Sequence, residues 1–232
     1  KIVFFPHTSI LWKNRVSKPH YSLNGQILLL GNQIDKKRWR PFFKNKMIVT
    51  GHTKYKKEWI QKILRVNKHD NFFSIKKIKI FTIIMKDFNN YSEKEKIRTI
   101  LSEVIDAIKL NFKNYKIIFK LAPKNYDENI SFLNDIKTKM KINFEFSNLH
   151  ILKLAKYSDY IFVIPPSAVP IDTMSLGKMS IELWNSKENS KFSYSIKSQK
   201  SLMNFFNLKK KDLLKLEKKK KIFLKKYSIL IY

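Results

Sequence analysis

The stretch from residue 160 to residue 178 constrains the fold most, because it has the pattern of a strand, a tight turn, a short helix and a helix stop in immediate succession. Residues 160–164 are all aromatic or aliphatic, which is typical of a strand buried on both faces. Two prolines end the strand, because proline has no N–H to donate to a sheet. Ser167 stands where a helix N-cap is expected and Gly177 where a helix C-cap is expected. This order is typical of an open α/β sheet.

The start of that short helix is a candidate ligand site. In an open α/β sheet such a helix points its free N–H groups toward the ligand crevice, and that location suits a phosphate. Asp172 lies one turn further on, where its carboxylate could accept hydrogen bonds from ribose hydroxyls. A second interpretation is equally consistent with the spacing: Ser167 only caps the helix, and Asp172 only interacts favourably with the helix dipole.

Strand and helix patterns alternate along most of the chain, so we predict an α/β fold with parallel sheets. Strands are expected at 1–5, 26–30, 47–50, 78–85, 116–121, 143–146, 160–164 and 178–183. Helices are expected at 35–43, 56–66, 132–140, 149–156, 201–206 and 210–226, and another begins at Ser92, where a capping box with Glu95 is predicted. Residues 185–198 are polar and are predicted to form a loop.

The alternation divides the chain into two domains. Residues 1–66 are expected to form part of an N-terminal Rossmann-like domain, 67–77 a polar linker, and 78–232 a C-terminal domain with terminal basic helices. The first domain holds only three predicted strands, and Lys1 opens directly into a strand. We therefore expect the chain to be a fragment that lacks its N-terminal part.

The net charge of +30, from 48 Lys and Arg against 18 Asp and Glu, raises nucleic acid or an anionic membrane as a partner. Most of the excess is lysine spread along a chain that is also rich in Asn, Ile, Phe and Tyr, a pattern of AT-rich genomes that needs no functional cause. The densest block is 209–221. The helix predicted at 210–226 combines it with Leu and Ile, so it either associates with a membrane surface or packs onto the first domain.

Several kinds of chemistry are disfavoured by the residues present. There is no cysteine, and the five histidines are scattered without metal-ligand spacing, so no metal site is expected. No glycine-rich phosphate motif occurs. A phosphate would then be held by a helix N-terminus and by lysines. The candidates are Lys86, at the end of the strand expected at 78–85, and Lys120, within the strand region 116–121; the alternative is that both are solvated surface lysines.

Three segments resemble the C-terminal part of GT-B-fold glycosyltransferases. Residues 158–167 (Ser-Asp-Tyr-Ile-Phe-Val-Ile-Pro-Pro-Ser), with Asp172 and Gly177-Lys178, resemble the strand, Ser, Glu/Asp, Gly-Lys/Arg-Pro signature. Residues 47–55 (Met-Ile-Val-Thr-Gly-His-Thr-Lys-Tyr) resemble the interdomain hinge, and residues 117–123 (Ile-Ile-Phe-Lys-Leu-Ala-Pro) a strand that usually ends Lys-Pro-His-Pro. The pattern is similar to that of bacterial surface-carbohydrate enzymes, including CDP-glycerol glycerophosphotransferases and UDP-N-acetylglucosamine 2-epimerases.

The resemblance implies roles for individual residues. Ser167 would meet the donor diphosphate and Asp172 the ribose hydroxyls. His7 resembles a histidine that faces the acceptor and would serve as a general base; the alternative is a structural or surface histidine. The chain departs from the family pattern where Ala122 replaces the histidine and where Met179 and Thr53 replace prolines, which leaves open an altered donor or a weakened enzyme.

The function implied by the resemblance is a metal-independent glycosyltransferase of bacterial surface polysaccharide biosynthesis. Its partners would be a nucleotide-sugar donor, which is a substrate so that no cofactor is expected, and a carbohydrate or lipid-linked acceptor. A cytoplasmic location is expected, with peripheral contact at the inner face of the membrane through the basic C-terminal helix.

Two alternatives remain open from the sequence. A glycerophosphotransferase or nucleotide-sugar epimerase could use the same fold, because a fold does not fix a reaction. A nucleic-acid-binding protein is the alternative from another class, based on Trp39, Phe42 and Phe43 interleaved with arginines.

Overall fold

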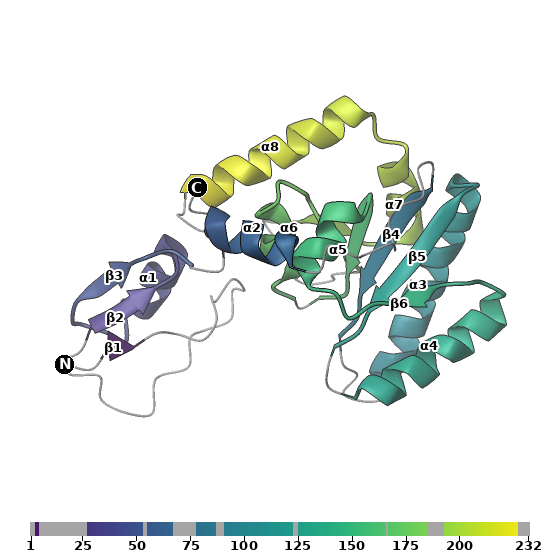
Figure 1. Cartoon of the computed structure of the whole chain (residues 1–232), viewed down its shortest axis with the longest axis horizontal. Coiled ribbons are helices and arrows are strands. Elements are labelled where there is room, and N and C mark those ends of the chain that lie inside the picture. Colours follow the sequence, from purple (N-terminus) through teal and green to yellow (C-terminus); the bar gives the residue numbers. More distant parts are fainter. Residues whose placement is uncertain are drawn as a thin grey trace. The chain divides into compact units, whose positions relative to one another are not determined.

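Two parallel sheets organise the chain in the computed structural model (Figure 1). The structure describes residues 3–4, 27–52, 55–66, 78–86, 91–122, 125–165, 167–184 and 193–226. They belong to two compact units, one formed by Lys1–Arg65 with Lys218–Tyr232 and the other by Val66–Glu217. The predicted linker 67–77 lies outside the described residues.

The first unit contains a small parallel sheet, as predicted. Its strands are β1 (Val3–Phe4), β2 (Ile27–Leu30) and β3 (Met47–Val49), arranged in that order. The helices of this part are α1 (Gln33–Trp39) and α2 (Lys57–Arg65). Leu28, Leu30 and Phe43 form the buried core, against which Trp39 packs.

The second unit is built on a parallel sheet of six strands. These strands are β4 (Lys79–Ile84), β5 (Tyr115–Lys120), β6 (Glu145–Phe146), β7 (Tyr160–Val163), β8 (Ile181–Leu183) and β9 (Tyr194–Ile196). Their spatial order is β6-β5-β4-β7-β8-β9, and every pairing is parallel. The chain therefore builds outward from β4 in one direction and then returns to build outward in the other from β7. The predicted parallel sheet is confirmed.

Helices cover both faces of this sheet. They are α3 (Tyr91–Asn111), α4 (Tyr126–Met140), α5 (Ile151–Tyr157), α6 (Val169–Met174) and α7 (Gln199–Phe206). The last helix, α8 (Lys210–Lys226), is shared by the two units, which divide between Glu217 and Lys218. Apolar residues of α3, α4 and α7 share one core with the sheet, whereas α5 and α6 pack against the opposite face (Figure 1). The first core is rich in aromatic rings: Phe81 on β4 stacks between Tyr160 and Phe162 on β7, with ring centroids 5.0 and 6.2 Å away.

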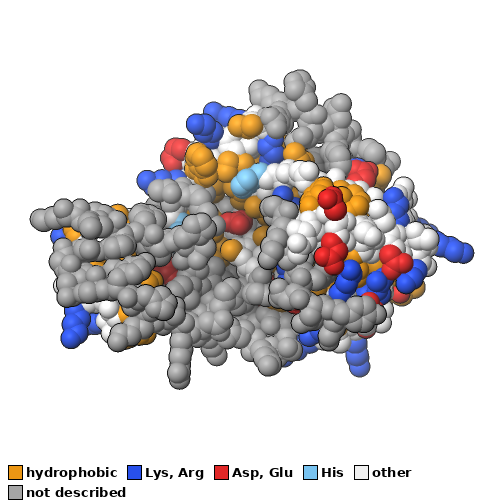
Figure 2. Space-filling view, turned by 90° about the horizontal axis from the view of Figure 1, so that it is seen from below, with side chains coloured by type: hydrophobic (Ala, Val, Ile, Leu, Met, Phe, Trp, Pro, Cys, Tyr) orange, Lys and Arg blue, Asp and Glu red, His pale blue; other side chains and the backbone are white. Residues whose placement is uncertain are grey.

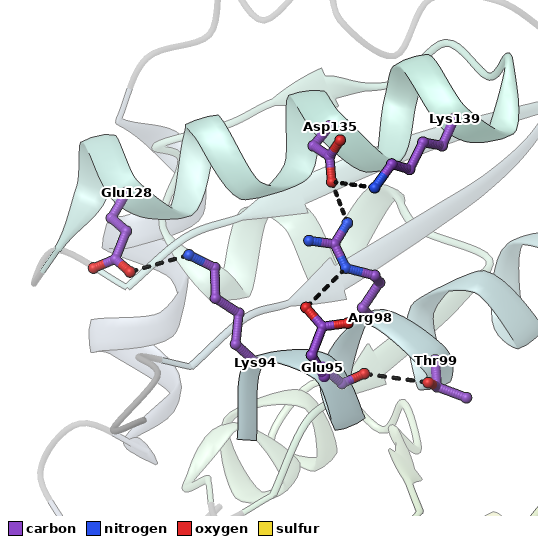
Figure 3. Close-up of polar contacts among 7 residues, drawn as sticks. All are labelled: Lys94, Glu95, Arg98, Thr99, Glu128, Asp135 and Lys139. Carbon is purple, nitrogen blue, oxygen red and sulfur yellow. Dashed lines mark hydrogen bonds and ion pairs between the residues drawn. The ribbon is translucent and has the colours of Figure 1, made fainter. Parts of the chain in front are cut away.

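A network of ion pairs joins α3 to α4 on the surface (Figure 3). Arg98 bridges two carboxylates, Glu95 on its own helix at 3.3 Å and Asp135 on α4. Asp135 also accepts Lys139 at 3.2 Å. The Arg98 guanidinium lies 4.9 Å from the ring centre of Phe132, so its apolar face covers the seam between the helices. Arg98 and Lys139 are thus paired with carboxylates on this surface.

The structure differs from the sequence prediction in several elements. Helix α4 begins at Tyr126 instead of residue 132, and α1 ends at Trp39 instead of residue 43. Two further differences concern β9 and α3. Strand β9 lies within residues 185–198, which we predicted to be a loop. This strand has three residues, of which Ile196 alone is fully buried. The sequence therefore contains no apolar run that would predict it. The helix α3 begins at Tyr91, so Ser92 lies inside its first turn and the predicted N-cap position is wrong. Its first-turn carboxylate Glu93 instead pairs with Lys86.

Candidate functional site

The order of the six strands identifies one edge of the sheet as the candidate site. Numbered along the chain within the second unit, the order is 3-2-1-4-5-6, with the reversal between β4 and β7. In doubly wound sheets of this order, ligands bind outside the carboxyl ends of the strands at the reversal. The register aligns Ile84 at the end of β4 with Lys120 on one side and Val163 on the other. Lys120 ends β5, and Lys86 and Ser167 follow β4 and β7, so all three residues lie near the carboxyl ends of neighbouring strands.

Lys120 is the last residue of β5, and its side chain is half-buried. Burial lowers the pKa of its ammonium group. The ammonium group of Lys120 forms no hydrogen bond or ion pair within the part of the chain that the structure describes. Because a cation removed from water is stable only with compensating partners, Lys120 is suited to bind an anion.

Lys86 differs from Lys120 although both follow central strands. Its ammonium group forms an ion pair with Glu93 in the first turn of α3. Both side chains are only about a quarter exposed, at 24% and 22%. Glu93 already neutralises Lys86, so of the two lysines that the sequence proposed as phosphate ligands, Lys120 is the stronger candidate.

The turn between β7 and α6 carries Ser167 and Asp172. The hydroxyl of Ser167 accepts the backbone N–H of Val169 at 3.2 Å, but the N-cap position belongs to Ala168, one residue later than predicted. Asp172 lies in the first turn of α6 and is half-buried. Gly177 has a positive φ of 76° and donates its N–H to the carbonyl of Met174 at 2.8 Å, but the C-cap position belongs to Ser175, two residues earlier than predicted. Ser167 and Asp172 thus lie on one segment at the candidate edge.

Lys178, which completes the Gly-Lys pair of the resemblance, has its ammonium group near the amino end of the strands. It donates hydrogen bonds to the carbonyls of Lys156 and Ser158, each at 2.8 Å. Burial lowers its pKa, and the carboxylates of Asp159 and Glu217 act in the opposite direction. Lys178 therefore stabilises the end of α5 and the start of β7.

The sequence prediction missed polar residues on β8 and β9. Glu182 is fully buried, and the hydroxyl of Ser193 donates to it at 2.5 Å. It is paired in register with Val163 on one side and Ser195 on the other, so it lies in the same cross-strand row as Lys120. Alternation of apolar and polar residues at 180–183 predicts a strand with one polar, solvent-facing side, so the sequence contains no signal that Glu182 is buried. Trp184, directly after β8, has a positive φ of 47°, a conformation that is uncommon for a large residue.

Three further sequence predictions concern a base, a metal ion and a membrane. His7, the proposed base, is outside the described residues. Within the described residues, no cluster of three or more His, Asp or Glu side chains could hold a metal ion. The helices described here include none that is long and apolar enough to cross a membrane.

The structure removes much of the basis for a nucleic-acid platform in the first unit. Phe43 is buried and Trp39 packs against the core, so of the three aromatic residues only Phe42, at 38%, is substantially exposed. On the face that Figure 2 shows, Lys and Arg side chains occur in separate groups among acidic and hydrophobic ones. Base stacking requires exposed aromatic rings, so this alternative is weakened.

The strand order defines a Rossmann-like α/β fold. Comparison with known proteins then identifies which Rossmann-like fold it is. No family model and no curated protein sequence matches the chain. Solved structures do match: UDP-GlcNAc 2-epimerase of Methanocaldococcus jannaschii in complex with UDP-GlcNAc and UDP has a TM-score of 0.58 and 18% identity, over 86% of this chain and 60% of that one.

Two further structures carry different names. HepE of Anabaena, in complex with UDP-glucose, has a TM-score of 0.53 and 12% identity, over 86% of this chain and 59% of that one. The wall teichoic acid polymerase TagF, with CDPG, has a TM-score of 0.50 and 12% identity, over 86% and 52%. The chain thus spans little more than half the length of these proteins. It has the GT-B-like fold that the sequence predicted.

Proposed function

We propose that the second unit binds a nucleotide sugar at the carboxyl edge of its sheet. The diphosphate would lie against the ammonium group of Lys120 and the backbone N–H groups of the β7–α6 turn, and the ribose would meet Asp172. The observation that carries this proposal is Lys120, half-buried beside the strand reversal and without a partner among the described residues. Nucleotide sugars in three solved structures of the same fold class support the choice of ligand: UDP-GlcNAc, UDP-glucose and CDPG.

The reaction we favour is glycosyl transfer in bacterial surface polysaccharide biosynthesis. In that reaction the acceptor hydroxyl oxygen forms a bond to the anomeric carbon while the bond from that carbon to the diphosphate oxygen breaks, and negative charge develops on the leaving diphosphate. A positively charged lysine in a partly dehydrated site stabilises such charge, so the step does not depend on a metal. His7 remains the predicted base that would take the proton of the acceptor hydroxyl.

Epimerisation of the sugar on its nucleotide is the second candidate. It is favoured by the M. jannaschii epimerase, whose 18% identity is the higher of the values given above. The two reactions give different products from UDP-GlcNAc: transfer releases UDP, whereas epimerisation inverts C2 and leaves the nucleotide attached. Proton NMR of UDP-GlcNAc incubated with the full chain, with and without a carbohydrate acceptor, distinguishes these outcomes.

Calorimetric titration tests the binding itself. The full chain would be titrated with UDP, UDP-GlcNAc, UDP-glucose and CDP-glycerol. Lys120→Met should weaken the tightest of these by about 10- to 100-fold, the scale of a hydrogen bond to a charged group. Asp172→Ala should weaken a nucleoside diphosphate by a similar factor.

Lys113→Met is the matched control, because Lys113 is an exposed lysine just before the amino end of the same strand. It should bind like the wild type. Absence of binding by all four compounds, or equal binding by Lys120→Met and the wild type, would contradict the proposal.

A further inference from the structure

Helix α8, the long yellow helix in Figure 1, has an exposed face of unusual composition. Six of its described side chains are exposed: Lys211, Leu214, Lys215, Lys218, Lys219 and Ile222. At 100° per residue they lie within about 140° of one another around the helix axis. Leu214 and Ile222 are 54% and 57% exposed, so both aliphatic side chains are largely in contact with solvent. The exposed face is thus a continuous stripe of lysine and aliphatic residues.

The other face of α8 accounts for its packing. Leu213 packs against the main core, and Leu216 is partly buried. Both acidic residues also lie on this side, Asp212 and Glu217, and Glu217 accepts the backbone N–H of Met179. Burial raises the pKa of Glu217, although the hydrogen bond and Lys178 act in the opposite direction. The helix therefore has its apolar packing face elsewhere, so Leu214 and Ile222 are not needed to hold it.

We infer that the exposed face of α8 docks on an anionic lipid surface. Among the side chains described in α8, this face has four positive charges and no carboxylate, so its charge is complementary to acidic headgroups. A bilayer interface also accommodates the two aliphatic side chains, which would insert between the headgroups while the lysines remain in water. Nucleic acid would attract the lysines but has no comparable use for Leu214 and Ile222. The inference does not depend on the proposed nucleotide-sugar site.

Co-sedimentation of the full chain with vesicles tests this inference through two variants. In the first, Lys211, Lys215, Lys218 and Lys219 are replaced by Gln, which preserves helix propensity. Its partition onto vesicles of equal phosphatidylglycerol and phosphatidylcholine should fall about 30-fold or more, given the contribution of each lysine at an anionic surface. In the second variant, Leu214→Gln with Ile222→Gln, partition should fall about tenfold through loss of apolar contact.

A charge-matched control separates this face from the general positive charge of the chain. Lys37, Lys113, Lys197 and Lys200 are all exposed, and their replacement by Gln removes the same charge from other elements. This variant should retain most of the binding. Circular dichroism would establish that all three variants keep the helical content of the wild type.

Three results would overturn the inference. The first is wild-type pelleting that is equal with phosphatidylglycerol-containing vesicles and with pure phosphatidylcholine. The second is equal loss in the α8 lysine variant and in the charge-matched control. The third is a Leu214→Gln and Ile222→Gln variant that binds vesicles like the wild type, while a labelled single-stranded oligonucleotide binds the wild type tightly and the lysine variant weakly. That third pattern would identify nucleic acid as the partner.

Discussion

The two edges of the large sheet differ in the hydrogen-bond and ion-pair partners of their polar side chains. At the amino edge, Asp159 accepts the Ile80 N–H at 2.9 Å and the Lys79 ammonium at 2.8 Å, and Lys178 satisfies two carbonyls. At the carboxyl edge, Lys120 has no partner among the described residues, and Trp184 adopts a left-handed backbone conformation. Satisfied polar groups stabilise a fold, whereas an unsatisfied cation and a strained residue are typical of sites that bind a ligand.

Lys178 at the amino edge and Lys120 at the carboxyl edge allow the two edges to be compared at the same residue type. Both are half-buried, and burial lowers the pKa of each. Lys178 compensates for burial with two carbonyls and two nearby carboxylates, whereas Lys120 has no such compensation among the described residues. The same substitution at the two positions should therefore separate a stabilising role from a binding role.

Lys178→Met should have the largest effect on stability. It leaves the carbonyls of Lys156 and Ser158 without this donor and removes a cation that interacts with Glu217. We expect the free energy of unfolding to fall by about 2 kcal/mol, the scale for partly buried polar groups that lose a partner. Urea denaturation followed by circular dichroism measures it. A change as small as that of the exposed control Lys113→Met would break the contrast between the edges.

Lys120→Met should have the opposite sign. The substitution removes a half-buried cation that has no partner in the described structure, so the free energy of unfolding should stay unchanged or rise by up to about 1 kcal/mol. Destabilisation similar to that of Lys178→Met would mean that Lys120 has a structural role.

The pH dependence of stability sharpens the prediction for Lys120. Because its folded pKa lies below the ordinary value of 10.5, the unfolded chain binds more protons between these two values. The unfavourable contribution of Lys120 therefore diminishes as the pH rises through that interval. The stability difference between Lys120→Met and the wild type should shrink accordingly, and nucleotide binding should weaken as Lys120 loses its charge. Denaturation and titration at a series of alkaline pH values test both expectations. A stability difference that grows with pH, or nucleotide binding that strengthens, would contradict them.

Asp159→Asn tests a weaker contact at the amino edge. Asparagine keeps an acceptor for the Ile80 N–H but loses the ion pair with Lys79, whose side chain is 52% exposed. Solvent screens such a pair, so we expect a loss of about 0.5 kcal/mol at neutral pH. The hydrogen bond to Asp159 raises the pKa of Lys79, so this stabilisation is present below the ordinary lysine pKa and is lost as pH rises through the folded value. The two proteins should therefore converge in stability at high pH; a constant difference would assign the effect to another contact.

The large sheet and its carboxyl edge are predictable from the sequence because both depend on local signals. The apolar runs of β4, β5 and β7 and the Pro-Pro turn after β7 are sufficient to predict where the strands end. Strand β9 is not predictable in this way, since its three residues alternate polar and apolar, and neither is the burial of Glu182 beside it.

The difference in pairing between Lys86 and Lys120 also cannot be predicted from the sequence. Lys86 is paired and Lys120 is not, because the first turn of α3 brings Glu93 to one strand end and, among the described residues, no carboxylate pairs at the other. Lys178 likewise depends on chain reversal through α6, which returns the backbone to the amino edge. Partners that are distant along the chain are set by packing, and local pattern does not encode them.

The smallest effect is expected at the α3–α4 seam, which belongs to neither edge. The hydrogen bond from Arg98, and next that from Lys139, lowers the pKa of Asp135 below the ordinary value of 3.8. A carboxyl group with a lowered folded pKa adds stability above its unfolded pKa, and that contribution is lost as the pH falls through the folded value. The Asp135 side chain is 40% exposed, so Asp135→Asn should destabilise less than any amino-edge variant and should leave nucleotide binding unchanged. Denaturation of both proteins at neutral pH and at a pH below the folded pKa checks this: their stabilities should differ only at neutral pH. If Asp135→Asn instead proved as damaging as Lys178→Met, the seam and not the amino edge would be the main polar support of this unit.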